Sequence, residues 1–127
     1  MAIDVKFCWN ELETRDMKAA SKFYEEVLGW TSHAWDPEKP DAYILLKDGE
    51  NAVAGIMDLG DPQFEGIPNH WFAYIQVEDV EATCAKVESA GGTIKRPPFD
   101  VPNVGKIAII ADSTDAVIGI TQPEEPM

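Results

Sequence analysis

The sequence repeats itself once, and this repeat constrains the possible folds more than any other feature. Residues 14–30 align without a gap to residues 77–93, at a shift of 63 positions. Residues 48–56 match residues 112–120 at a shift of 64 positions, with Asp, Ala, Val, Gly and Ile recurring in register. Two blocks in the same order at nearly the same shift indicate duplication of a unit of roughly 60 residues.

Each copy of the repeat has the pattern of a strand, a helix and three further strands. Apolar and polar residues alternate over 7–14 and 71–77, which is typical of a half-buried strand. Asp16 and Asp79 follow at N-cap positions of a helix, and glycines close the helix in both copies. Further strands are expected near 31–35, 43–46 and 53–59, and near 93–95, 106–111 and 116–121.

The length and composition fit one domain built from both copies. The chain has 127 residues, of which 45% are hydrophobic and 26% charged, as in an ordinary globular domain with a packed core. The sequence therefore predicts a single α+β domain over 1–127. Its two tandem βαβββ units are expected at about 5–60 and 68–123.

The net charge and the cysteines limit the binding partners and the cellular compartment that we expect for this chain. The formal net charge is −13, and a field of this sign repels nucleic-acid phosphates and anionic lipid surfaces. We find no signal-peptide pattern near the start and no apolar run of membrane-spanning length. Cys8 and Cys84 are expected to be buried apolar residues in a reducing compartment, which predicts a cytoplasmic protein.

An ordered set of motifs resembles the vicinal oxygen chelate superfamily, which includes glyoxalase I, extradiol dioxygenases and bleomycin-resistance proteins. The match runs from about Phe7 to Pro123. The resemblance implies a glyoxalase/bleomycin-resistance-like fold in which two βαβββ units form a U-shaped cup, and it implies a homodimer. The residues that carry it are Trp9 to Leu12, Asp16, Phe23, Tyr24, Leu28 to Trp30, His70, Trp71, Tyr74, Val77 to Asp79, Pro97, Pro98, Asp100, Pro102, Gly105 and Asp112.

The resemblance also implies four metal-binding positions, on the first and last strand of each unit. Counting back from the helix-capping Asp residues places the first-strand positions at Trp9 and Phe72. The last-strand positions fall at Gly55 and Gly119. None of these four residues has a side chain that binds a divalent cation, so we expect neither a metal of the family's usual kind nor any other cofactor.

Strand alternation indicates which residues line the cup instead. The face that carries the ligand positions presents Trp9, Glu11, Phe72 and Tyr74, and Glu11 is the repeat mate of Tyr74. These aromatic residues either fill the cup as core or form a small-molecule pocket with Glu11 as its charged anchor. The second interpretation fits the usual composition of ligand sites, which are mostly apolar with a few polar groups.

Three further residues are candidates for contact with a ligand. His70 lies two positions before Phe72 on the same face, where it either forms hydrogen bonds at the rim or holds a displaced metal together with Glu11. The Pro-rich segment 96–105 is expected to be a loop over the cup mouth. There Phe99 or Asp100 contacts the ligand, unless the segment is only a rigid connector.

The leading functional hypothesis is a metal-independent protein that binds an organic ligand, cationic or aromatic, in this cup. The alternative is a glyoxalase-type lyase or isomerase, or a dioxygenase-type enzyme, that uses Glu11 as general base or holds a divalent metal atypically. A third possibility is an interaction module that works only through its dimer face. No arrangement for nucleophilic catalysis and no phosphate-binding glycine motif is present in the sequence.

Overall fold

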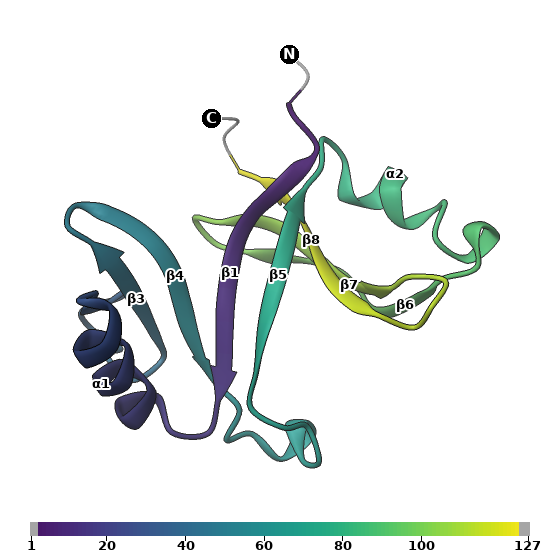
Figure 1. Ribbon diagram of the computed structural model, residues 1–127. Coiled ribbons are helices and arrows are strands. Elements are labelled where there is room, and N and C mark those ends of the chain that lie inside the picture. Colours follow the sequence, from purple (N-terminus) through teal and green to yellow (C-terminus); the bar gives the residue numbers. More distant parts are fainter. Residues whose placement is uncertain (1–2, 125–127) are drawn as a thin grey trace. The chain divides into compact units, whose positions relative to one another are not determined.

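The computed structural model describes residues 3–124 and divides into two compact units, which we treat separately (Figure 1). The N-terminal unit is Trp9–Phe72. The C-terminal unit combines Met1–Cys8 with Ala73–Met127. Each unit contains most of one copy of the predicted repeat. The division falls within the first strand of each copy, so Lys6–Cys8 belong to the C-terminal unit and His70–Phe72 to the N-terminal unit.

The N-terminal unit is a four-stranded sheet with a helix on one face (Figure 1). Its strand order is β2-β3-β4-β1, in which β4 runs parallel to β1 and the other neighbouring pairs are antiparallel. The elements are β1 (Lys6–Thr14), α1 (Met17–Leu28), β2 (Thr31–Ala34), β3 (Tyr43–Asp48), β4 (Asn51–Asp58) and a short 3-10 helix at Pro62–Phe64.

The C-terminal unit repeats this arrangement in the order β5-β8-β7-β6. Here β5 runs parallel to β8, and the remaining pairs are antiparallel. Its helix is shorter than α1 and continues into a turn of 3-10 helix. The elements are β5 (His70–Gln76), α2 (Val80–Cys84), the 3-10 helix Glu88–Ala90, β6 (Thr93–Val101), β7 (Gly105–Ala111) and β8 (Val117–Pro123).

The strand register confirms the internal repeat at single-residue resolution. In the N-terminal unit Glu11 of β1 pairs with Gly55 of β4. In the C-terminal unit Tyr74 of β5 pairs with Gly119 of β8, and these are the repeat mates of Glu11 and Gly55. The predicted α+β fold of two βαβββ units is therefore confirmed.

The helix caps also match the prediction. The side chain of Asp16 accepts a hydrogen bond from the backbone N–H of Ala19 at 3.0 Å. Asp79 does the same for Ala82 at 3.1 Å. Gly29 ends α1 in the left-handed conformation, with φ of 76°, which glycine adopts without steric cost.

Each unit has its own apolar core between its helix and its sheet. In the N-terminal unit, Met17, Ala20 and Tyr24 pack against the core from the region of α1. Burying this face of the sheet leaves the alternate residues of β1 on the opposite face. The buried residues are Leu12, Leu46, Ala54 and Ile56 in the N-terminal unit, and Val77, Val80, Cys84, Ala108 and Ile120 in the C-terminal unit.

The structure corrects two expectations from the sequence. The Pro-rich segment 96–105 is not a loop over most of its length, because β6 continues to Val101. Register shifts between Ile94 and Phe99 accommodate the prolines in this strand. Cys8 is exposed rather than buried, whereas Cys84 is buried as expected. Among the described residues, no helix is long and apolar enough to cross a membrane.

Candidate functional site

The face of the N-terminal sheet opposite α1 gathers polar and aromatic side chains. Side chains alternate between the two faces of a strand, and Leu12 and Thr14 of β1 are buried on the side of the helix. The opposite face therefore carries Trp9, Glu11 and Glu13. Glu11 is only 5% exposed, and the Glu13 side chain is 14% exposed. With Tyr43 and His70, these residues form what we call the polar-aromatic face.

Tyr43 of β3 lies at the centre of this face and was missed by sequence reasoning. Its hydroxyl accepts a hydrogen bond of 2.9 Å from the indole Nε1 of Trp9. A Cβ atom at Gly55 would overlap the Tyr43 ring and hydroxyl, so the absence of a side chain at Gly55 makes room for the tyrosine. A glycine inside a strand often marks such a close approach, so Gly55 is the residue in the sequence that could have indicated a bulky side chain packed at this place.

Burial and neighbouring carboxyls favour the protonated form of Tyr43. Burial raises the pKa of the Tyr43 phenol well above its ordinary value, and the nearby charge of Glu11 raises it further. The hydrogen bond from Trp9 acts in the opposite direction, because it stabilises the phenolate. Tyr43 therefore stays neutral and serves as a hydrogen-bonding group on this face.

Glu13 is also shifted toward its protonated form. Burial raises the pKa of the Glu13 carboxyl, and a hydrogen bond with Glu11 opposes this shift. Burial is the larger of the two effects, so the carboxylic acid form of Glu13 is favoured more than in a free glutamate.

His70 is the first residue of β5, and its side chain contacts the carboxyl of Glu13. Its Nε2 lies 3.2 Å from Oε1 of Glu13, and its Nδ1 lies 2.7 Å from the carbonyl oxygen of Pro68. The edge of the His70 ring meets Phe72, with ring centroids 6.3 Å apart. His70 therefore contacts a main-chain carbonyl oxygen through one ring nitrogen and the carboxyl of Glu13 through the other.

The other candidate residues divide between the units. Phe72 belongs to the N-terminal unit and is 8% exposed. Tyr74, Phe99 and Asp100 belong to the C-terminal unit. Phe99 and Asp100 lie in β6, where they pair with β7, and the Arg96 guanidinium stacks over the Phe99 ring at 3.7 Å. Within residues 3–124, no group of three or more His, Cys, Asp or Glu side chains is arranged to hold a metal ion.

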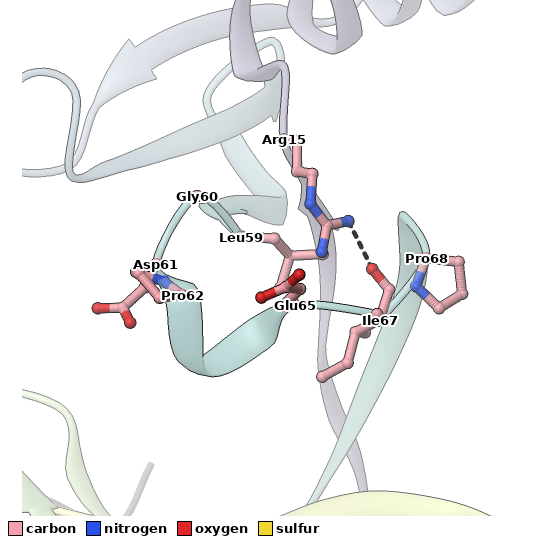
Figure 2. A pocket seen from close by; sticks show the side chains of 9 residues that line it. Arg15, Leu59, Gly60, Asp61, Pro62, Glu65, Ile67 and Pro68 are labelled. Carbon is pink, nitrogen blue, oxygen red and sulfur yellow. Dashed lines mark hydrogen bonds between the residues drawn. The ribbon is translucent and has the colours of Figure 1, made fainter.

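A hollow of about 460 Å³ lies beside the segment between β4 and β5 (Figure 2). Arg15 reaches into it and donates a hydrogen bond to the carbonyl oxygen of Ile67, which Figure 2 shows, and another to that of Phe64. The guanidinium therefore anchors the main chain of this segment, which leads to Pro68 and His70. The hollow is lined by Arg15, Leu59, Gly60, Asp61, Pro62, Glu65, Gly66, Ile67 and Pro68.

The repeated βαβββ architecture places the chain in a known class of proteins. The family model of the Glyoxalase/Bleomycin resistance protein/Dioxygenase superfamily matches residues 9–119, and the chain belongs to this superfamily. The methylmalonyl-CoA epimerase of Mycobacterium tuberculosis shares the fold, with a TM-score of 0.65 over 94% of this chain and 89% of the epimerase chain. Its sequence identity is 16%, so the likeness concerns the fold alone.

Two curated proteins are similar to this chain in sequence. "Putative glyoxylase CFP32" of Mycobacterium tuberculosis is 38% identical over 115 residues, which cover 91% of this chain and 43% of that protein. The chain thus spans less than half the length of this relative. "Lactoylglutathione lyase" of Haemophilus influenzae is 26% identical over 110 residues, which cover 82% of each protein.

Proposed function

We propose that the chain is a metal-independent member of its superfamily that binds an organic small molecule on the polar-aromatic face. The observation that carries this proposal is the hydrogen bond between Trp9 and Tyr43, beside Gly55. By the resemblance of the motifs, Trp9 and Gly55 stand where metal-dependent members place two ligands. Here an indole, which only donates a hydrogen bond, and a tyrosine ring occupy that region.

The donor chemistry of these positions does not fit a divalent cation. Glycine has no ligating side chain, and a tryptophan indole is not a metal ligand in proteins. The second pair of positions, Phe72 and Gly119, likewise supplies no donor atom. We therefore derive no chemical step through a metal ion.

The chemistry of the face favours an aromatic or cationic ligand. Trp9 and Tyr43 offer ring surface, and Glu11 and Glu13 offer carboxyl oxygens beside it. Aromatic faces attract cations, and a carboxylate adds a charge-assisted hydrogen bond. We further propose that the protein acts in the cytoplasm as a homodimer, without nucleic-acid or membrane partners.

The second candidate function is an enzyme of the lyase or isomerase type. It is favoured by the hydrogen-bonded carboxyl and imidazole groups of Glu11, Glu13 and His70, which are the residue types that perform general acid–base catalysis. The relative from Haemophilus influenzae carries the name of a lyase. Turnover of a bound compound would separate this candidate from simple binding.

A ligand screen with two tryptophan variants tests the leading proposal. Aromatic amines, aromatic acids and neutral aromatics are added to the protein, and the melting temperature and tryptophan fluorescence are measured. We expect at least one compound to raise the melting temperature and to change the fluorescence. Trp9→Phe should abolish the fluorescence response, whereas Trp35→Phe, at a residue that is 43% exposed, should retain it. Binding that is unaffected by Trp9→Phe would place the ligand elsewhere and contradict the proposal.

A further inference from the structure

The two hydrogen bonds of His70 determine where its protons lie. The Pro68 carbonyl oxygen accepts but cannot donate, so the 2.7 Å contact requires a proton on Nδ1. The 3.2 Å contact between Nε2 and Glu13 Oε1 then needs one more proton between those two atoms. This proton belongs either to a Glu13 carboxylic acid or to a His70 imidazolium, and in both cases the pair holds a single exchangeable proton.

The two residues of this pair differ in their exposure to solvent. The side chain of His70 is 33% exposed, whereas that of Glu13 is 14% exposed and Glu11 beside it is 5% exposed. The imidazole therefore joins a buried carboxyl to the outside. Within the N-terminal unit, two titratable groups that act on this cluster are Glu11 on the same strand as Glu13 and Tyr43 on β3.

Glu11 and Tyr43 have different effects on the pair. The hydrogen bond from Glu11 lowers the pKa of Glu13 and so opposes the effect of burial, which raises it. Tyr43 remains a neutral phenol because burial raises its own pKa strongly. Glu13 and His70 are thus the two groups that are in direct contact, and Glu11 changes the pKa of the carboxyl in that contact.

We propose that Glu13 and His70 together form a general acid–base pair that removes a weakly acidic proton from an aromatic or heteroaromatic compound bound on the polar-aromatic face. This inference rests on the proposed function, since the compound must bind beside Trp9. The pair acts as base when Glu13 is a carboxylate and His70 is neutral with its proton on Nδ1. It takes one proton from the ligand, and the proton leaves to water through the exposed imidazole.

The geometry distinguishes this pair from Glu11 alone as the base. Glu11 is almost fully buried, whereas His70 presents part of its ring to solvent. The Pro68 carbonyl fixes the ring orientation, and the Arg15 hydrogen bonds to Phe64 and Ile67 hold the main chain just before Pro68. An oriented imidazole with a carboxyl partner is a favourable arrangement for proton transfer.

A probe of general-base catalysis tests the inference without knowledge of the natural ligand. In 5-nitrobenzisoxazole, a base removes the C3 proton, the C–H electron pair completes a nitrile, and the N–O bond breaks to give 2-cyano-4-nitrophenolate. No oxidant, reductant or metal is needed, and the coloured phenolate reports the rate. We expect turnover above the buffer rate, and we expect Glu13→Gln and His70→Gln each to lower kcat/KM by about tenfold or more.

The chain contains its own control for this experiment. Its other histidine, His33, is exposed and bonds to the Thr31 hydroxyl, so His33→Gln should leave the rate unchanged. In the wild-type protein, the rate should rise with pH as Glu13, whose pKa is raised by burial, loses its proton. Wild-type rates in Glu13→Gln and His70→Gln, or no turnover above buffer, would overturn the inference.

A second measurement does not depend on catalysis or on folding of a variant. Nitrogen-15 NMR of histidine-labelled wild-type protein resolves the tautomers of the two imidazoles. We expect neutral His70 to carry its proton on Nδ1, and an Nε2–H tautomer would overturn the inference. If the unreactive analogue 5-nitroindazole binds beside Trp9 but the reactive probe is not turned over, the acid–base inference fails while the proposed binding function stands.

Discussion

The indole of Trp9 donates a hydrogen bond of 2.9 Å to the hydroxyl of Tyr43, and the tyrosine lies where a side chain at residue 55 would project. A glycine at position 55 is therefore a packing requirement. The same glycine stands at a position where metal-dependent relatives are expected to place a ligand. A glycine at this position supplies no side chain of its own and leaves the space that the Tyr43 ring occupies.

A side chain at position 55 should destabilise the protein through Tyr43. The Cβ of Gly55→Ala would overlap the tyrosine hydroxyl and ring, which must then move. We expect the free energy of unfolding to fall by about 1–3 kcal/mol, as for overpacked cores. Denaturant unfolding measures this loss. In a Tyr43→Ala background the same substitution should cost much less, and an equal cost in both backgrounds would contradict the contact.

Tyr43 should resist ionisation in the folded protein. Because burial raises its pKa, the folded state holds the phenolic proton more tightly than the unfolded state does. The corresponding stability is fully present below the ordinary tyrosine pKa and is lost as the pH rises further. An alkaline titration followed by phenolate absorbance should show one of the three tyrosines ionising only on unfolding. Tyr43→Phe should remove that late component, whereas Tyr24→Phe should leave it in place.

The repeat in the sequence predicted the architecture because each copy must bury the same faces. Asp16 and Asp79 indicated both helix starts. The shift between the copies matched Glu11 with Tyr74 and Gly55 with Gly119, and the strand register pairs these residues in the same way in both units. These features depend on local chemistry and on periodicity, which a single sequence displays directly.

Tyr43 and the course of β6 could not be predicted in the same way. The contact of Tyr43 with Trp9 depends on which strands are neighbours, and nothing local to residue 43 indicates it. Pro97 and Pro98 suggested a loop, but β6 is the last strand in the sheet order and has register shifts beside them. An edge strand tolerates the missing N–H groups of proline, so this segment forms a strand although its prolines predict a loop.

Protein purified without chelator should contain no stoichiometric transition metal. The prediction follows from the side chains of Trp9, Gly55, Phe72 and Gly119, which offer no donor atoms. Elemental analysis for zinc, nickel, manganese and iron is the measurement. One equivalent of any of these metals, lost together with activity in His70→Ala, would contradict both this prediction and the metal-independent function.

The exposed apolar side of α1 should take part in a homodimer. Phe23 and Val27 lie one helical turn apart and are 54% and 58% exposed, which is costly in water unless a partner covers them. Light scattering at micromolar concentration should give roughly twice the chain mass of 14.0 kDa. Val27→Asp should shift the protein toward monomer, whereas Lys22→Asp on the same helix should shift it less. A monomeric mass for the wild type would contradict the prediction.

The ligand site should prefer aromatic amines to aromatic carboxylic acids. Glu11 is 5% exposed on the same strand face as Trp9, and its hydrogen bond with Glu13 places two carboxyl groups beside the aromatic rings. An ammonium group would supply a charge-assisted hydrogen bond and would rest on the aromatic rings, which attract cations by roughly 0.5–2 kcal/mol. The net charge of −13 favours encounter with cations in the same way, most strongly at low salt.

A thermal-shift screen with matched benzylamines and benzoates measures this preference. We expect the amines to stabilise the protein more, and Glu11→Gln to weaken amine binding by about 10- to 150-fold, because a hydrogen bond to a charged group contributes about 1.5–3 kcal/mol. Glu26→Gln, which removes an exposed carboxylate from α1, is the control for net charge and should change amine binding little. Greater stabilisation by benzoates, or amine binding that Glu11→Gln leaves unchanged, would show that the carboxyl of Glu11 does not select the ligand.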